Sequence, residues 1–278
     1  MKNLSEYGYK TNNRYYTIAE IGINHGGDME VAKKLIESAA RTGVDSVKFQ
    51  TYITEKRTPK DSPIFDILKK CELPFEAFSE LKAFANNLNL EFFSTPFDEE
   101  SVDLLNEIGC DLYKIASFDV VNHKLLTKVA KTKKPIILSV GMSNLEEIKT
   151  AYSILTEQGA PVTLLHCISA YPTAPEDANL GAIEILKKSF DCVIGQSDHT
   201  DDIKVPTFAA AMGAQVLEKH FKIDEAMDCI DAPVSITEDQ LRQLVQNLKE
   251  VDSILGSGQV MLTDAQAPCE QYRRPSSL

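Results

Sequence analysis

Two lysines lie inside short apolar segments of the sequence, an unusual place for a charged side chain. Lys48 lies in SVKFQTY (46–52) and Lys114 in LYKIAS (112–117), each shortly before its segment ends. A lysine that points into a protein without a nearby anion is costly, because burial removes its hydration. We therefore expect both lysines to face a bound anion. Hydroxyl groups at the same level of other segments would complete a site for a phosphate and a carboxylate: Ser94, Thr95, Ser117, Ser139 and Ser197.

Two histidines stand near the ends of the last two such segments. His199 follows CVIGQSD (192–198), and His220 lies in QVLEKHF (215–221). Either histidine alone is more often a structural residue, but a pair on neighbouring strand ends favours a divalent metal site with open positions for water and substrate. Lys219, between two polar residues, is as easily explained by an outward, snorkelling side chain. The carboxylates near the pair are Asp198, Glu218 and Asp231.

The segments that carry these residues predict the fold. Eight runs rich in β-branched and aromatic residues alternate with helical patterns, and capping-box patterns at Ser143–Glu146 and Thr237–Gln240 indicate two helix starts. Nearly continuous apolar runs are typical of parallel strands covered by helices. We predict an α/β protein with a single (β/α)₈ TIM barrel. A doubly wound sheet is the alternative, but this sequence lacks the Gly-rich first turn that such a sheet usually has. The expected strands are 15–22, 46–52, 91–97, 112–117, 135–141, 161–169, 192–198 and 215–221.

Domain organisation follows from the same pattern. We expect an N-terminal extension over 1–14, the barrel over 15–255 and a C-terminal linker over 256–278. Long segments at 53–73 and 222–236 follow strands on the side where barrel enzymes build their sites, so each is a candidate lid. All eight expected strands end in polar residues on that side, which favours an enzyme.

Composition excludes several classes of function. The 278 residues carry 29 basic and 41 acidic side chains, a net charge of −12, which disfavours binding to nucleic acid or an anionic membrane. Six cysteines show no C-x-x-C spacing and indicate reduced thiols. Without an apolar leader or a long apolar run, we expect a soluble, cytoplasmic protein.

Eight ordered motifs resemble the sialic acid synthase family, whose members condense phosphoenolpyruvate with an N-acylated amino sugar to form nonulosonic acids. The resemblance covers roughly residues 15–240. No single motif is decisive, but eight in order are specific. They are AEIGINHGGD (19–28), VKFQTY (47–52), STPFD (94–98), KIASFD (114–119), SVGMS (139–143), LHCISAYPT (165–173), QSDHT (196–200) and EKHF (218–221).

The resemblance implies roles for particular residues. His199 and His220 would bind Mn²⁺ or Mg²⁺. Glu20, Gln50, Asp119 and Asp231 would face the open-chain sugar or the metal-bound water. Catalysis would rest on Glu20, Lys48, Lys114, Asp119 and His220. Phosphoenolpyruvate would be held by Lys48, Thr95, Lys114, Ser117, Ser139, Ser169, Tyr171 and Ser197.

Departures from the family pattern leave the sugar open. Asp119 stands where many members have Glu, Ser169 where the neuraminate branch has Asn, and Asp231-Ala232 where Asp-His is frequent. Members usually form homodimers and carry an antifreeze-like C-terminal domain, whereas this sequence stops at RRPSSL, where the linker to that domain would begin. Two alternatives stay open: a Schiff-base aldolase using Lys48 or Lys114, and a non-catalytic sugar-phosphate-binding barrel that lost its second domain.

Overall fold

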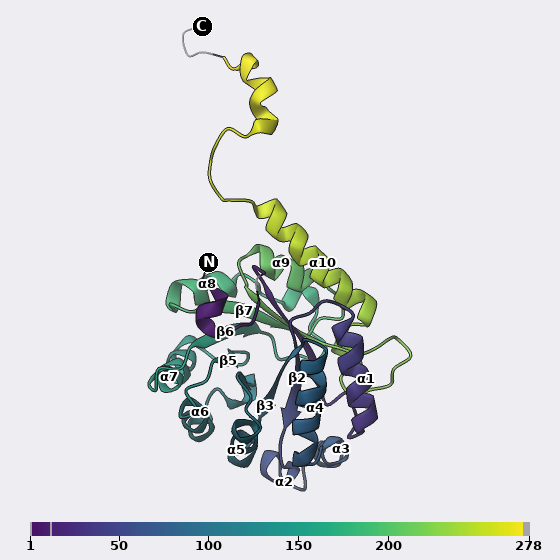
Figure 1. Cartoon of the computed structure of the whole chain (residues 1–278). Helices are drawn as coiled ribbons and strands as arrows, with labels where there is room; N and C mark the ends of the chain where they lie inside the picture. Colours follow the sequence, from purple (N-terminus) through teal and green to yellow (C-terminus); the bar gives the residue numbers. More distant parts are fainter. Residues whose placement is uncertain (1, 12, 275–278) are drawn as a thin grey trace.

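Eight parallel strands close into a barrel in chain order, with β1 paired to β8. The computed structural model describes residues 2–11 and 13–274 (Figure 1). The predicted (β/α)₈ barrel is confirmed, and every observed strand falls within its predicted range. The strands are β1 (Tyr16–Gly22), β2 (Ser46–Thr51), β3 (Glu91–Pro96), β4 (Tyr113–Ile115), β5 (Ile136–Ser139), β6 (Val162–Cys167), β7 (Val193–Asp198) and β8 (Val216–His220).

Helices connect successive strands and cover the outside of the barrel (Figure 1). The α-helices are α1 (Met29–Ala40), α2 (Thr54–Arg57), α3 (Phe65–Cys71), α4 (Phe75–Asn87), α5 (Glu99–Glu107), α6 (His123–Ala130), α7 (Leu145–Thr156), α8 (Ala182–Ser189), α9 (Lys204–Ala211) and α10 (Glu238–Leu255). Short 3₁₀ turns are η1 (Leu4–Tyr7), η2 (Ser117–Asp119), η3 (Pro175–Asp177), η4 (Ala232–Val234) and η5 (Asp264–Tyr272).

One of the two predicted helix starts is displaced. The capping box at Thr237 and Gln240 begins α10 as expected. The box expected at Ser143 and Glu146 instead uses Asn144 and Glu147. Ser143 lies one residue before the N-cap and its hydroxyl donates to the carbonyl of Gly141, whereas the Asn144 side chain accepts from two backbone N–H groups at the start of α7.

The N-terminal end of the barrel is closed by an apolar floor. Tyr16, Ile18 and Phe93 pack there with buried residues from the other strands, and Leu4 and Tyr9 join them from the segment expected to be only an extension. The Tyr9 hydroxyl donates to Thr163 at 2.7 Å. Residues 1 and 12 of that segment lie outside the described residues. This floor leaves the polar residues of the strands concentrated at the opposite end.

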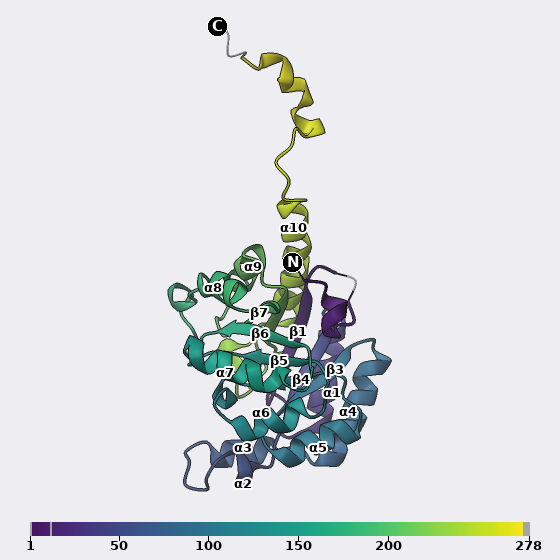
Figure 2. The same ribbon diagram turned by 90° about the vertical axis from the view of Figure 1, so that its left-hand side faces the viewer.

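The two ends of the barrel carry different additions. The segment with α2 and α3 lies at the end where the strands finish, and the C-terminal arm projects from the other end (Figures 1 and 2). The arm, expected as a linker over 256–278, contains η5, whose residues are exposed; residues 275–278 lie outside the described residues. No helix in the described ranges is long and apolar enough to cross a membrane.

Candidate active site

A cavity of about 360 Å³ opens above the carboxyl ends of the strands. Successive side chains of a strand point to opposite faces, so Glu218 and His220 face the cavity whereas Lys219 faces outward. Its volume falls in the range of small-molecule sites. The predicted site residues that line it are Glu20, Lys48, Gln50, Thr95, Lys114, Ser117, Ser139, Tyr171, Ser197, His199, His220 and Asp231.

Both lysines of the cavity are paired with carboxylates. Lys48 Nζ lies 2.7 Å from Glu20 Oε2 and 3.7 Å from Glu218 Oε2, and Lys114 Nζ lies 3.0 Å from Glu218 Oε1. All four side chains are buried. Two carboxylates therefore already neutralise the lysines in this structure, and the expected contact of both lysines with a substrate anion stays a prediction. An anionic substrate would have to compete with Glu218 and Glu20 for these ammonium groups.

Burial and the ion pairs shift the pKa values of these four side chains in different directions. Burial opposes ionisation of Glu218, but the ammonium groups of Lys114 and Lys48 outweigh it and lower the pKa of this carboxyl to about 2. Burial lowers the pKa of Lys114. For Lys48, Glu20 and Glu218 outweigh burial and raise the pKa. Burial raises the pKa of Glu20. Of the two carboxyls paired with the lysines, Glu20 therefore holds a proton more readily than Glu218 does.

Hydroxyl groups surround the lysines. Thr95 Oγ1 accepts from Lys48 at 3.2 Å, and the Ser197 hydroxyl donates to Glu218 at 2.9 Å. The Ser139 hydroxyl is buried without a hydrogen-bond partner. Gly141 N–H donates to Ser117 Oγ at 2.9 Å. A buried hydroxyl without a partner is unfavourable, so Ser139 is a ready donor for a bound anion.

His199 and His220 lie side by side, with ring centroids 5.5 Å apart. The carbonyl of Ile168 lies 2.7 Å from His199 Nδ1, which places the proton on that nitrogen and leaves Nε2 as a lone-pair donor. Burial, then the charge of His220, lowers the pKa of His199 to about 3, so its imidazole is neutral. The buried Nδ1 of His220 has no hydrogen-bond partner and lies 3.4 Å from Asp231 Oδ2.

These donors fit a cation that takes much of its coordination from water or substrate. Within the described residues, no group of three or more His, Cys, Asp or Glu side chains converges as a metal cage. Two adjacent imidazoles with open positions beside them suit a catalytic rather than a structural ion. His199 and His220 would therefore be the principal protein ligands.

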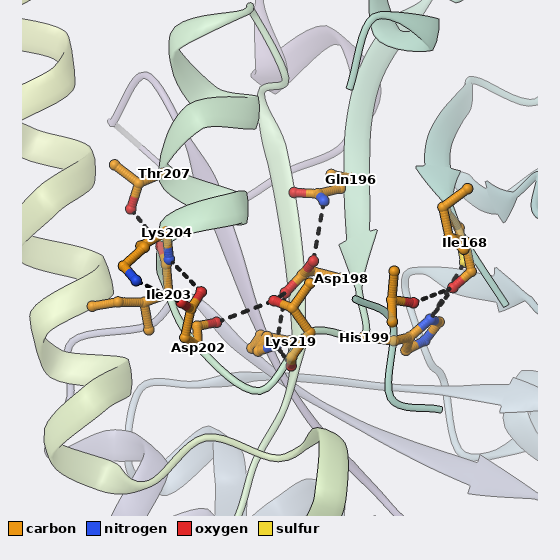
Figure 3. A network of polar contacts seen from close by, with 12 residues as sticks. Ile168, Gln196, Asp198, His199, Asp202, Ile203, Lys204, Thr207 and Lys219 are labelled. Atoms are coloured by element: carbon orange, nitrogen blue, oxygen red, sulfur yellow. Dashed lines mark hydrogen bonds and ion pairs between the residues drawn. The ribbon is translucent and has the colours of Figure 1, made fainter. Parts of the chain in front are cut away.

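Asp198 takes no part in this donor set. Its carboxylate accepts from Lys219 and from the Thr200 hydroxyl at 2.7 Å each, and from Gln196 at 3.2 Å (Figure 3). Lys219 also donates to the backbone carbonyl of Thr200. The pair lies outside the cavity and fixes the loop that carries His199.

Comparisons with known proteins identify the family of this chain. The sequence model of the NeuB family matches residues 35–260. The chain belongs to the NeuB family. It is 42% identical to the N,N'-diacetyllegionaminic acid synthase of Campylobacter jejuni, over 87% of this chain and 77% of that protein. It is 33% identical to a pseudaminic acid synthase of the same species, over 92% and 79%.

A solved relative shares the whole architecture. The crystal structure of N-acetylneuraminic acid synthetase from Leptospira borgpetersenii, in complex with citrate, superimposes with a TM-score of 0.91 at 38% identity, covering 94% of this chain and 92% of that one. This NeuB family chain is therefore an enzyme of the sialic acid synthase type, as the resemblance implied.

Two predicted site residues of this NeuB family member lie beside the cavity rather than on its wall. The Asp119 carboxylate accepts from Asn122 at 2.9 Å near the start of α6, and burial raises its pKa. Ser169 contacts Cys167, with Ser169 Oγ 3.8 Å from Cys167 Sγ. The roles expected for both residues stay predictions.

Three residues of the cavity have positions or contacts that the sequence did not predict. Glu218 was considered only as a metal ligand, although it is the common partner of both lysines. Arg57 and Cys167 also line the cavity and received no role. The alternation Glu218-Lys219-His220, which places Glu218 on the same face as His220, was a usable signal for the first. Arg57 lies outside the periodicity of the strands, because it ends α2, a four-residue helix that follows β2.

Proposed function

We propose that this enzyme condenses phosphoenolpyruvate with an N-acylated amino sugar, forming a nonulosonic acid and releasing phosphate by C–O cleavage. The observation that carries the proposal is the paired lysines next to two adjacent histidines at one end of a closed barrel. The lysines suit a phosphate and a carboxylate, and the histidines suit the ion that would activate an aldehyde.

Each group would have a defined task. Lys48 and Lys114 would hold the phosphate and carboxylate of phosphoenolpyruvate, helped by the unpartnered Ser139 hydroxyl. The site is preorganised, because the carboxylates that keep both lysines in place are already present. Ser117, Ser197 and Thr95 would add hydroxyl contacts around the same anion. Tyr171, whose ring lies 4.1 Å from that of His199, would cover it from the cavity mouth.

The chemical step then balances as follows. Carbon 3 of phosphoenolpyruvate forms a bond to the aldehyde carbon, water adds to carbon 2, and the bond from carbon 2 to the phosphate oxygen breaks. A divalent ion, Mn²⁺ or Mg²⁺, held by His199 and His220 would supply Lewis-acid polarisation of the aldehyde. Glu20, with its raised pKa, would exchange the proton of the water or of the new hydroxyl. Gln50, Asp231 and, from beside the cavity, Asp119 would orient the sugar.

The Schiff-base aldolase is less well supported by this geometry. An aldolase lysine must be an unprotonated amine, whereas the carboxylates raise the pKa of Lys48. Lys114 has a lowered pKa but donates to Glu218 at 3.0 Å. Trapping of either lysine by borohydride in the presence of substrate would favour the aldolase.

The decisive experiment follows phosphate release from phosphoenolpyruvate with a panel of N-acylated amino sugars, with and without divalent ions. We expect release that depends on both the sugar and the ion, and ¹⁸O placed in the bridging position should leave with the phosphate. Lys114→Ala should abolish release, and Lys128→Ala, a surface variant, should not. Absence of turnover with every sugar would contradict the proposal.

The cell compartment and assembly are part of the same proposal. All six cysteines are free, which is typical of a reducing compartment, and we place the enzyme in the cytoplasm. A homodimer remains the expectation from the family resemblance.

A further inference from the structure

Arg57 enters the cavity from the segment between β2 and α4. It is the last residue of α2, and its guanidinium lies 3.7 Å from the ring centroid of Phe97 and 4.6 Å from that of Tyr52. Its NH1 donates to Gln50 Oε1 at 2.9 Å. The two rings and the amide hold the guanidinium in one orientation against the wall of the cavity.

Arg57 differs from the other cations of the cavity in having spare donors. Lys48 and Lys114 are both in ion pairs, whereas Arg57 forms none with the described residues. Asp119 and Asp231 act on it only at longer range. A guanidinium has five N–H donors and stays charged at neutral pH, and only one of its hydrogen bonds here is made to a cavity side chain. Several donors are therefore left for a ligand.

Apolar side chains share the cavity with Arg57. Ile64 and Ile67 from the same segment, Phe118 from η2 and Ile230 from the loop after β8 also line it. Their exposed fractions are 49%, 42%, 62% and 46%. Apolar side chains this exposed around one opening indicate a binding surface.

The combination selects a class of ligand group. A fixed cationic donor beside apolar walls matches a group that carries a carbonyl oxygen and a methyl, such as an acylamino substituent. A phosphate would use the donor but leave the apolar walls without a partner. It would also add negative charge to a cavity that already holds the carboxylates of Glu20, Glu218 and Asp231 together with phosphoenolpyruvate.

We propose that Arg57 is a specificity-determining residue that donates to the carbonyl oxygen of an acylamino group on an uncharged acceptor sugar, while the apolar walls contact the acyl methyl. The inference rests on the proposed condensation. A chain of contacts links Arg57 to Lys48. Arg57 donates to Gln50, Gln50 Nε2 lies 3.5 Å from Glu20 Oε1, and Glu20 Oε2 lies 2.7 Å from Lys48 Nζ. Arg57 thus also positions Gln50 between the two substrates.

The test compares two acceptors that differ in one group: an acylamino sugar and its counterpart with a hydroxyl in that place. The ratio of their kcat/KM values is measured for the wild type, Arg57→Gln and Arg57→Lys. We expect Arg57→Gln to reduce the preference for the acylamino sugar by about tenfold to hundredfold, the effect of losing one charged hydrogen bond. Arg57→Lys should restore part of it, because the charge remains but the planar fork does not.

Lys56→Gln provides the matched control. Lys56 is the neighbour of Arg57 in α2, is 43% exposed on its side chain and pairs with Glu100 away from the cavity. The Lys56→Gln substitution removes one positive charge, as Arg57→Gln does, and should leave the ratio of the two kcat/KM values unchanged. In Arg57→Gln the KM for phosphoenolpyruvate should change by less than about threefold, which corresponds to about 0.6 kcal/mol. Thermal denaturation of each variant reports whether folding is intact.

The outcomes are distinguishable. Equal losses on both acceptors, or an unchanged ratio, would show a structural role and overturn the inference while the condensation stands. A selective rise in the KM for phosphoenolpyruvate, or a 6-phosphorylated acceptor that depends on Arg57 more than the acylamino sugar does, would also overturn it. No turnover by the wild type with any acceptor would instead remove the proposed function, and the inference with it.

Discussion

Glu218→Gln is the sharpest perturbation of the cavity, because one carboxylate serves two buried lysines. The substitution keeps the shape of the side chain and removes its charge. Lys114 then loses the carboxylate 3.0 Å away, whereas Lys48 keeps Glu20 at 2.7 Å. We expect the variant to be destabilised without ligand and to gain more stability than the wild type from a bound anion.

The magnitude follows from two bounds. At an effective dielectric constant of about 20, unit charges 3.0 Å apart attract by about 5 kcal/mol. Lys114 can escape this loss by releasing its proton, which costs about 4 kcal/mol between a pKa of about 10.4 and pH 7.5. Breaking a buried pair usually costs about 3–5 kcal/mol. We therefore expect a loss of about 3–4 kcal/mol, or about 5–7 °C in Tm for a chain of this length.

The loss depends on pH in a defined direction. In the variant, the folded-state pKa of Lys114 lies further below its unfolded value, so the unfolded chain binds more protons and the stability of the variant rises with pH. The gap in Tm between variant and wild type should narrow as the pH rises from 7 to 9.5.

Differential scanning calorimetry with and without inorganic phosphate measures both effects. The control is Glu184→Gln, which removes a carboxylate from an exposed pair with Lys188 and should leave Tm unchanged. A Glu218→Gln protein as stable as the wild type at pH 7, with the same response to phosphate, would refute the role of Glu218 as the shared counterion.

Three further predictions concern activity. Because burial lowers the pKa of Lys114, kcat/KM for phosphoenolpyruvate should decrease with rising pH at a pH below the ordinary lysine pKa. Lys114→Arg should move this decrease to higher pH. A decrease that occurs only at or above the ordinary lysine pKa in the wild type would contradict the assignment. In Gly141→Ala the new methyl would lie 2.5 Å from Ser169 Oγ, and we expect a cost of about 1–3 kcal/mol with a higher KM for phosphoenolpyruvate, measured by denaturation and steady-state kinetics. Removing divalent ions with EDTA should abolish condensation but leave phosphoenolpyruvate binding by calorimetry, and His199→Ala should not be restored by added Mn²⁺.

Much of the fold was predictable because its signals are local. Each strand is a continuous apolar run, and the helix starts at Asp28 and Thr237 carry their own capping residues. The shift from Ser143 to Asn144 shows the limit of such signals, since two neighbouring residues are both of a capping type and only the structure shows that Asn144 caps α7. The polar strand ends were predictable for the same reason, because a barrel brings all carboxyl ends to one face.

The sequence by itself predicted many of the residues that line the cavity, including both lysines and both histidines, and it placed the chain in its family. Only the tertiary structure decided how they pair. Glu218 lies 104 residues from Lys114, and their contact exists because barrel closure brings β8 across from β4. Arg57 lies in the cavity wall at the end of α2, where its guanidinium packs against Phe97 and Tyr52. Periodicity fixes the face of a strand residue, whereas its partner across the barrel depends on contacts distant in sequence.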